Sequence, residues 1–338
     1  MELLLLIPLV ISFFVTFITI PYWIKKTKNI GLIWEDMNKY KQSKNIAGSG
    51  GIIVVMAFIF GVLSYIAIKT FVLKTNVTTV EIFALLTTIT LASIIGFIDD
   101  IFGWVNGGLS AKIRIFLVFV AAVPLMVINA GYSKITLPLI GTVNIGLLYP
   151  VIIIPLGVVG AVTTYNFLAG YNGLETGQGI LVIGALSIVA FLTGSPWLSL
   201  IGLSMICSLA AFFIFNKFPA KVFPGDVLTY SVGALIACMA ILGNFERIAI
   251  FFFIPYILET FLKIRGNLKK QSFGIPQKDG SLELPYNKVY GLEHAAIWLL
   301  KKIKKDGKAY EKQVVYLIWG FQIGIILLGF LIFGKSFF

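Results

Sequence analysis

The sequence has few charged residues for its length. Of its 338 residues only 12% are charged and 58% are hydrophobic, with a mean hydropathy of +0.95. A soluble domain usually carries about 25% charged residues, so this chain has too few to cover a surface in water. Intrinsic disorder is excluded too, because it needs low hydrophobicity. The composition therefore predicts a protein that crosses a membrane many times.

Cysteine and histidine are nearly absent. Cys207 and Cys238 both lie within apolar stretches, and His294 is the only histidine. This set gives no pattern for a disulfide framework or a zinc site. We expect His294 to lie on an interfacial helix rather than to act in catalysis.

Long apolar stretches are abundant, and a membrane-spanning helix needs roughly 20 mainly apolar residues. The chain offers ten such stretches, so we predict an all-α transmembrane fold. We assign residues 1–338 to one domain. Glu2 stands where a signal peptide would be positive, so we expect the first stretch to be retained. The predicted spans are 3–24, 50–68, 80–98, 113–130, 147–165, 179–194, 196–216, 227–244, 248–264 and 313–334.

Basic residues fall mainly on one side of this topology. The loops after odd-numbered spans hold 22 of the 27 Lys and Arg residues. The positive-inside rule then places these loops in the cytoplasm and both termini outside. The net charge of +12 is thus a topology signal, and we expect no nucleic-acid partner. The basic residues on the other side are Lys69, Lys74, Lys134, Arg247 and Lys335.

One long loop, 265–312, separates the last two predicted spans. It contains a hairpin pattern, IPQKDGSLEL, with Asp279 and Gly280 at the turn. A Lys-rich amphipathic stretch follows, YGLEHAAIWLLKKIKK. We expect a helix there, either on the inner membrane face or packed on the protein.

Carboxylate and amide side chains gather in four places, all on the predicted cytoplasmic side. Four such clusters on one face predict a shared site at the membrane surface. They are Asp36 and Asn38 in the first loop, Asp99 and Asp100 at the end of the third span, Asn166, Asn172 and Glu175 after the fifth, and Asp226 before the eighth.

This donor set favours a divalent cation and a phosphorylated substrate. Mg²⁺ prefers oxygen ligands, typically one or two carboxylates with substrate phosphates and water. Asn166 and Asp226 are the candidate ligands, with Mn²⁺ as the alternative ion. Lys112 and Arg114 could neutralise phosphate oxygens, and the turn at Gly170 allows close backbone approach.

Taken alone, each motif has a simpler explanation. An acidic pair at a helix end can be a solvated cap, an Asn/Gly-rich stretch can be a turn, and Asp226 can be an N-cap. A secondary transporter is the alternative from another class, but transporters place ionisable residues near the membrane midplane. Here only Glu259 approaches the interior, so the clusters together favour an enzyme.

The succession DDIFG, NFLAGYNGLETGQ and FNKFPAKVFPGD resembles the polyprenyl-phosphate N-acetylhexosamine-1-phosphate transferases. The similarity runs over about residues 32–289. NFLAGYNGLETGQ and DGSLELPYNK are most similar to the dolichyl-phosphate GlcNAc-1-phosphate transferases. This resemblance implies a ten-helix membrane fold with a cytoplasmic active site. It also implies Mg²⁺-dependent transfer of GlcNAc-1-phosphate from UDP-GlcNAc to a polyprenyl or dolichyl phosphate, releasing UMP, as the first membrane step of N-glycan assembly.

The resemblance implies roles for individual residues. Asn166 and Asp226 match magnesium-contacting positions. Asn172 and the Gly170 backbone match groups that hold uracil, and Phe223 matches an aromatic side chain that stacks on the base. The other expected substrate-binding residues are Asp36, Asn38 and Glu175.

The acidic pair and the basic residues after it match the lipid-phosphate side of the site. Asp99 and Asp100 match the family's acidic pair, and we expect them to orient groups or to accept a residual proton. Lys112 matches a phosphate-contacting lysine, with Arg114 as the alternative because this loop has two extra residues. A one-step attack by the lipid phosphate is favoured, and a two-step route through an aspartyl-phosphate stays open.

Two departures from the family pattern stand out. An Arg-His-Arg motif before the Ile-Pro of the last loop is replaced by 272–274, preceded by Lys269 and Lys270. A Pro-Glu of the first loop is replaced by Ala47 and Gly48. The pyrophosphate and sugar contacts of those groups are thus unassigned.

Donor, source and oligomeric state are less constrained. The same reaction class with another UDP-N-acetylhexosamine and an undecaprenyl-type lipid, for cell-wall polymers, is the alternative. Lysine outnumbers arginine 24 to 3, which is typical of an AT-rich genome. We expect the plasma membrane of an archaeon, with the ER membrane as the alternative, and a homodimer stays open.

Overall fold

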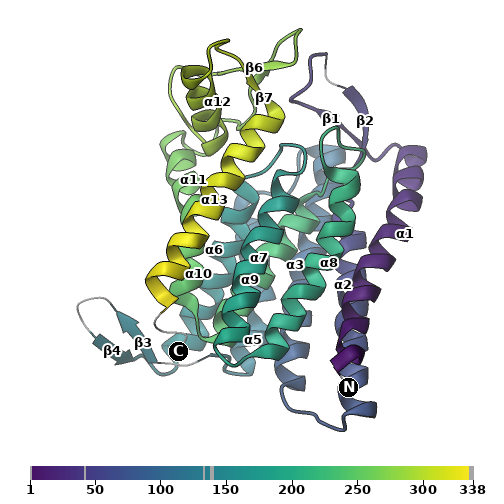
Figure 1. Cartoon of the computed structure of the whole chain (residues 1–338), viewed down its shortest axis with the longest axis vertical. Helices are drawn as coiled ribbons and strands as arrows, with labels where there is room; N and C mark the ends of the chain where they lie inside the picture. The colour runs from purple at the N-terminus through teal and green to yellow at the C-terminus, as the bar shows by residue number, and fades with distance from the viewer. Residues whose placement is uncertain (1, 42, 132–133, 138–140, 335–338) are drawn as a thin grey trace.

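The apolar stretches form a bundle of helices with short strands and one further helix at one end (Figure 1). The computed structural model describes residues 2–41, 43–131, 134–137 and 141–334. The α-helices are α1 (Ile7–Ile30), α2 (Gly51–Ala67), α3 (Thr79–Asn106), α4 (Ala111–Ala121), α5 (Val123–Val127), α6 (Ile154–Phe167), α7 (Leu174–Leu192), α8 (Pro196–Asn216), α9 (Asp226–Gly243), α10 (Glu246–Phe252), α11 (Ile254–Arg265), α12 (Leu292–Ile303) and α13 (Glu311–Phe333).

Shorter elements complete the chain. A 3₁₀ turn covers Glu2–Leu6, and π-helical turns cover Ile68–Val72 and Tyr149–Ile153. The strands form two antiparallel pairs and one three-stranded sheet of order β5-β6-β7. They are β1 (Ile33–Asp36), β2 (Ser43–Ala47), β3 (Lys134–Leu137), β4 (Gly141–Asn144), β5 (Ile275–Pro276), β6 (Ser281–Glu283) and β7 (Ala309–Tyr310).

Within the described part of the chain, eight helical segments are long and apolar enough to span a membrane. This confirms the predicted all-α, polytopic membrane fold. The predicted spans 113–130 and 248–264 are each divided, into α4 and α5 and into α10 and α11. Pro124 and Pro255 stand at the start of the second helix of each pair. Because proline lacks the backbone N–H and clashes with the preceding turn, it favours a helix start at these two positions, whereas Pro21 stays within α1.

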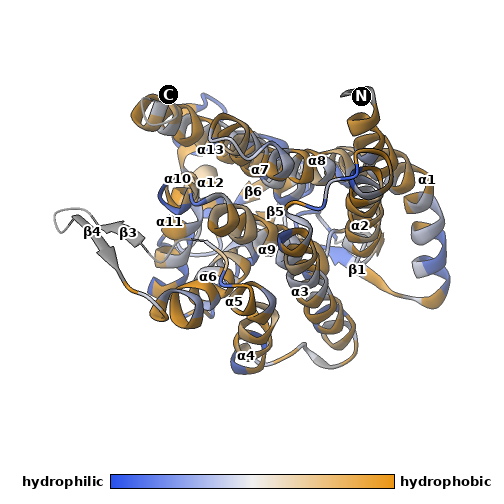
Figure 2. Cartoon of the chain, turned by 90° about the horizontal axis from the view of Figure 1, so that it is seen from below, coloured by the Kyte–Doolittle hydropathy of each residue, from blue (hydrophilic) through white to orange (hydrophobic). Residues whose placement is uncertain are grey.

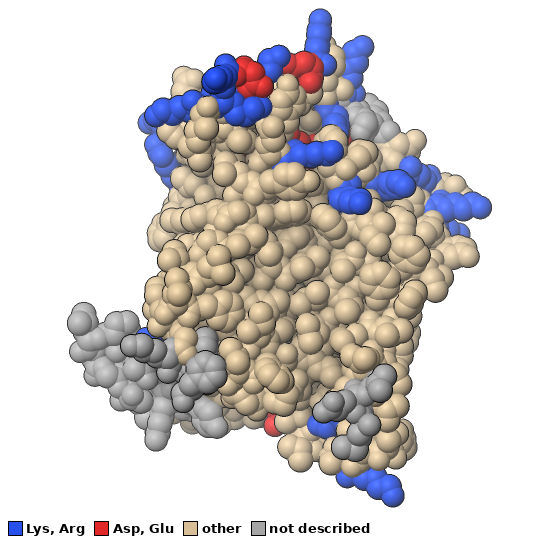
Figure 3. Space-filling view, in the orientation of Figure 1, with Lys and Arg blue, Asp and Glu red and all other residues tan. Residues whose placement is uncertain are grey.

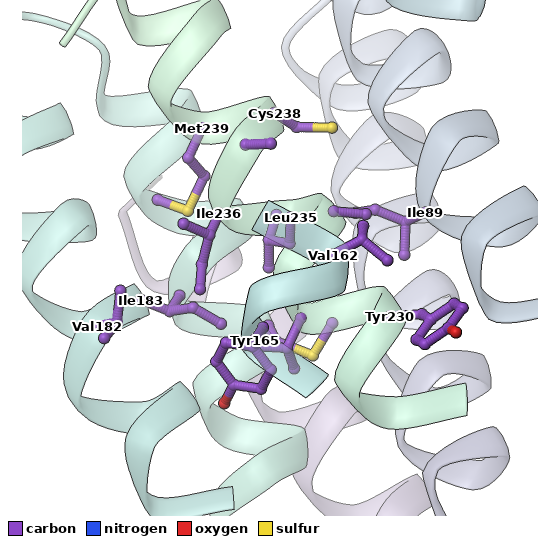
Figure 4. Packing of buried hydrophobic residues seen from close by; sticks show 14 of the residues in the cluster. Ile89, Val162, Tyr165, Val182, Ile183, Tyr230, Leu235, Ile236, Cys238 and Met239 are labelled. Atoms are coloured by element: carbon purple, nitrogen blue, oxygen red, sulfur yellow. The ribbon is translucent and has the colours of Figure 1, made fainter. Parts of the chain in front are cut away.

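Helix α9 lies at the centre of the bundle, packed against α3, α6 and α7, and 83% of its 18 residues are buried. Leu235, Ile236 and Met239 of α9 lie among side chains from these neighbours (Figure 4). At Gly233 a Cβ atom would lie 2.7 Å from the Cα of Val162, so this glycine lets α6 approach closely. The start of α9, at Asp226, is therefore held firmly in the bundle.

The long loop folds much as the sequence predicts. β5 pairs antiparallel with β6, in the register Ile275 with Glu283, and Asp279 Oδ1 accepts hydrogen bonds from the N–H and hydroxyl of Ser281. The predicted amphipathic helix is α12. It packs on α11 and α13 and buries Glu293 and His294, so it is a helix packed on the protein. Burial lowers the pKa of His294, which favours its neutral form.

Charge and apolar surface occupy different parts of the molecule. Figure 2 shows hydrophobic residues along the outer helices, and Figure 3 shows Lys and Arg gathered mainly at the end that carries β1, β6 and α12. Between the two ends, the face shown in Figure 3 has almost no charged residue. This pattern agrees with the predicted segregation of basic residues. Lys335, counted on the other side, lies outside the described residues.

Candidate active site

One wall of the site forms where α3 meets the start of α9. The sequence placed Asp99 and Asp100 at the end of a span, but α3 continues to Asn106, so the pair lies inside the helix. Asp100 Oδ1 accepts a hydrogen bond from the backbone N–H of Asp226 at 2.7 Å. It therefore binds an N–H group that a helix start leaves without a partner in the helix.

Two glycines allow this close approach. A Cβ atom at Gly96 of α3 would lie 2.4 Å from the carbonyl oxygen of Asp226. A Cβ atom at Gly225 would lie 2.2 Å from Asp100 Oδ2, and Gly225 has a φ of +72°. Both positions exclude a larger side chain, so α3 and α9 are in direct backbone contact beside Asp100.

Arg114 of α4 joins the two acidic segments. Its Nη1 lies 3.1 Å from Asp99 Oδ2 and 3.9 Å from Asp226 Oδ2. Asp99 Oδ1 also accepts from the N–H of Leu109 at 2.6 Å, so Asp99 fixes the loop that leads into α4. Lys112 is exposed and is not among the described residues that line the adjacent cavity, whereas Arg114 is. Of the two cations left open by the sequence, the structure brings Arg114 to the site.

These residues border a cavity of about 840 Å³, within the usual range for small-molecule sites. Six predicted site residues line it, whereas Asp36, Asn38, Asn172, Asp99 and Lys112 are not among the described residues that do so. The six predicted residues that line the cavity are Asp100, Asn166, Gly170, Glu175, Phe223 and Asp226.

We call Asp100, Arg114 and Asp226 the helical wall.

Another part of the lining comes from loop segments, and we call Gly170, Tyr171 and Phe273 the turn wall. The N–H of Gly170 donates to Glu175 Oε1 at 2.6 Å, and its carbonyl accepts from Asn38 Nδ2 at 2.9 Å. The Tyr171 and Phe273 rings are stacked, with centroids 6.5 Å apart. Burial raises the pKa of Tyr171 well above its ordinary value, so its hydroxyl stays neutral and accepts from the N–H of Gly274 at 3.2 Å.

Asp36, Asn38 and Asn172 are buried beside the cavity and support the turn wall. Asp36 Oδ2 accepts from Asn172 Nδ2 at 2.9 Å, and its Oδ1 accepts from the N–H of Asn38 at 3.1 Å. All three side chains are at most 5% exposed. The structure thus brings these predicted residues together as a hydrogen-bonded support.

Phe223 owes its place to the first loop. Its N–H donates to the carbonyl of Ala47 at 2.8 Å, and its carbonyl accepts from the N–H of Gly50 at 2.9 Å. The segment around Ala47, which departs from the family's Pro-Glu pattern, therefore acts through its backbone and holds an aromatic ring at the cavity.

Sequence reasoning missed several lining residues. Trp34, Trp104, Gln271 and Phe273 line the cavity, but the motif analysis did not select them. Gln271 and Phe273 lie at the segment that replaces the family's Arg-His-Arg motif. The replacement of that motif was the signal in the sequence that this segment lines the site with side chains different from the family's.

The donor set fits a magnesium ion. Asn166 Oδ1 accepts from the hydroxyl of Thr229 at 2.9 Å, which orients the amide and leaves a second lone pair. The Asp226 side chain is 28% exposed and lines the same cavity. Among the described residues no group of three or more His, Cys, Asp or Glu could hold a metal. Asn166 and Asp226 are two oxygen donors at one cavity, and Mg²⁺ takes as few protein ligands as this when substrate phosphates and water supply the rest.

These features describe a membrane protein with a cavity lined by acidic, basic and aromatic side chains at one end of its bundle. Residues 82–244 match glycosyl transferase family 4. A candidate UDP-N-acetylglucosamine–dolichyl-phosphate N-acetylglucosaminephosphotransferase of Saccharolobus solfataricus is 36% identical over 94% of this chain and 93% of its own length.

A protein of Sulfolobus acidocaldarius with the same name is 30% identical over 94% of this chain and 93% of its own length. The phospho-N-acetylmuramoyl-pentapeptide-transferase of Streptococcus pyogenes is 30% identical over 75% of this chain and 77% of its own length. The chain therefore belongs to glycosyl transferase family 4. This membership confirms the resemblance seen in its motifs.

Proposed function

We propose that the protein transfers GlcNAc-1-phosphate from UDP-GlcNAc to a polyprenyl phosphate such as dolichyl phosphate and releases UMP. The observation that carries this proposal is the helical wall. Two carboxylates, Asp100 and Asp226, and the guanidinium of Arg114 line one cavity together with the turn wall. The names of the two archaeal relatives, which are similar over nearly the whole chain, support the same activity.

In this reaction an oxygen of the lipid phosphate attacks the β-phosphorus of the sugar nucleotide. The new bond joins that oxygen to phosphorus, and the bond from phosphorus to the oxygen of the α-phosphate breaks, so UMP leaves with that oxygen. A phosphate monoester has a second pKa near 6, so the nucleophile is largely dianionic at neutral pH. Direct attack therefore needs no strong general base.

The residues of the helical wall would neutralise and orient phosphate groups. Arg114 presents a planar fork of donors suited to phosphate oxygens. Asp99 holds that guanidinium, and Asp100 holds the backbone of Asp226. Charge neutralisation and positioning are the main tasks in phosphoryl transfer.

We propose Mg²⁺ as the cofactor, held by Asn166 and Asp226. When bound, it would neutralise phosphate oxygens as negative charge redistributes. Because Thr229 orients Asn166 and Asp100 fixes the start of α9, both oxygen ligands are held in place before the ion arrives.

We also propose that the site faces the cytoplasm of an archaeal cell. The cavity lies at the end of the bundle where Lys and Arg gather in Figure 3, and basic residues favour the cytoplasmic side. The isoprenoid tail could then stay in the bilayer while its phosphate meets a water-soluble nucleotide. The two relatives from Saccharolobus and Sulfolobus support the archaeal source.

A transfer assay tests this function. Purified protein in lipid nanodiscs is incubated with Mg²⁺, dolichyl phosphate and radiolabelled UDP-GlcNAc. We expect label in the lipid phase, UMP in equal amount, and loss of both when EDTA is added. Parallel reactions contain UDP-GalNAc or UDP-MurNAc-pentapeptide with undecaprenyl phosphate, because the streptococcal relative is named for the latter class of donor. Label only with UDP-MurNAc-pentapeptide would overturn the donor, and no lipid product with any donor would overturn the enzyme.

A further inference from the structure

Glu311, at the first position of α13, contacts the turn wall from outside the cavity. Its side chain is 3% exposed, and its Oε1 accepts a hydrogen bond from the backbone N–H of Asn172 at 2.8 Å. Its Oε2 forms an ion pair with Lys39 of the first loop. Neither Glu311 nor Lys39 is among the described residues that line the cavity. Any effect of this pair on the ligand must therefore pass through the turn.

The turn from Gly170 to Gly173 depends on such outside contacts. Both glycines have positive φ, +106° and +83°, so the segment is not part of a helix. The side chain of Asn172 donates to Asp36, and its backbone N–H donates to Glu311. The beginning and the end of the chain thus bind Asn172 through different groups.

Lys39 balances the negative charges of two buried carboxylates, Asp36 and Glu311. Its Nζ lies 3.5 Å from Asp36 Oδ2, in addition to its ion pair with Glu311, and 3.8 Å from the centroid of the Phe218 ring. A buried carboxylate needs an opposite charge or several hydrogen bonds to stay ionised. Lys39 supplies the opposite charge to Glu311, and the N–H of Asn172 donates a hydrogen bond to it.

We infer that Glu311 is a positioning residue that sets the place of the turn 170–172 and thereby the affinity of the cavity for the sugar nucleotide. This inference rests on the proposed function. Removing the carboxylate leaves the buried N–H of Asn172 without its acceptor, which is costly enough for the turn to move toward another partner. Gly170 and Tyr171 line the cavity, so they would move with it. The helical wall, on α3, α4 and α9, would stay in place.

Four variants separate the hydrogen bond from the ion pair. Glu311→Ala removes both, and Glu311→Gln keeps an acceptor for Asn172. The exchange Lys39→Glu with Glu311→Lys keeps opposite charges but offers Asn172 no acceptor. The control is Glu283→Gln, since Glu283, on β6, pairs with Lys301 of α12 and is not among the described cavity-lining residues.

In the transfer assay we expect Glu311→Ala and the exchange to raise KM for UDP-GlcNAc by about tenfold, the effect of one lost hydrogen bond of this kind. Their kcat should stay within about twofold of the parent value. Glu311→Gln should keep KM within about threefold, and Glu283→Gln should match the parent. Rescue by the exchange, or an equal loss of kcat in Glu311→Ala, would overturn the inference.

Hydrogen exchange followed by mass spectrometry provides a readout that needs no activity. In the ligand-free protein, the peptide containing Asn172 should exchange faster in Glu311→Ala than in Glu311→Gln. Unchanged exchange of that peptide would refute the positioning role even if no donor were active. Failure of the parent protein in the transfer assay would instead refute the proposed function, so the two failures are distinct.

Discussion

The two walls of the cavity are held by different means. In the helical wall, Asp100 contacts the backbone of α9 directly, and Gly96 and Gly225 leave no room for adjustment. In the turn wall, Gly170 is held by two side chains, Asn38 from the first loop and Glu175 from the start of α7. Backbone contact between buried helices is stiffer than a turn tied by side chains. We therefore expect changes in the first wall to lower kcat, and changes in the second to raise KM.

The largest effect should follow from Asp226→Asn. The substitution keeps the size of the side chain but removes a negative charge from the proposed ion site. We expect kcat to fall by about 100-fold or more, because charge stabilisation at a preorganised site contributes on this scale. Initial rates at saturating UDP-GlcNAc over a range of Mg²⁺ concentrations measure it. Unchanged kcat at every Mg²⁺ concentration would remove Asp226 from the ion site.

Gly225→Ala tests the fit between α3 and α9. The new Cβ atom would lie 2.2 Å from Asp100 Oδ2, so the start of α9 must shift. We expect a loss of about 1–3 kcal/mol in stability and a fall of about tenfold in kcat. Gly194→Ala is the matched control, because Gly194 also has a positive φ, +82°, but nothing lies within 4 Å of its Cβ position. Equal kcat for the two variants would show that the close fit is unimportant.

Arg114 and Lys112 can be ranked against each other. Arg114 lines the cavity and Lys112 is exposed, so Arg114→Ala should lower kcat by about 10- to 100-fold and Lys112→Ala by much less. Arg114→Lys should fall between them, since lysine keeps the charge but lacks the bidentate fork. Parallel kinetics of the three variants give the ranking. A larger loss for Lys112→Ala would restore the lysine as the phosphate contact.

The smallest effect should come from the turn wall. Asn38→Ala removes the donor to the carbonyl of Gly170, so we expect KM for UDP-GlcNAc to rise about fivefold with kcat nearly unchanged. Asn76→Ala, at an exposed position in the loop between the second and third spans, serves as the control. A fall in kcat without a change in KM would contradict the division of labour between the walls.

The sequence predicted the membrane fold well because burial in lipid leaves a clear signal, a long apolar stretch. It failed to predict the breaks at Pro124 and Pro255, since proline inside a span is also tolerated as a kink. The acidic clusters were visible because charge is rare in this chain. Asp36, Asn38 and Asn172 were selected, but only the structure shows that they support a turn.

Other parts of the site left no local signal. Glu311 was not selected, because a glutamate at a helix start is an ordinary N-terminal residue and its partners lie 139 and 272 positions away in sequence. The choice between Lys112 and Arg114 was equally hidden. On α4 the two positions face different ways, and the direction depends on where the helix begins, at Ala111 after the N-cap Ser110.

The contact between Asn172 and Glu311 has a consequence for how the protein is made. During synthesis, residues 36–39 emerge long before the start of α13. A nascent chain that has inserted its earlier helices already contains Asp100, Arg114 and Asp226, but its turn still lacks an acceptor for Asn172. The turn wall is thus complete only once α13 has been made and inserted, so any affinity that depends on this contact should appear only after that step.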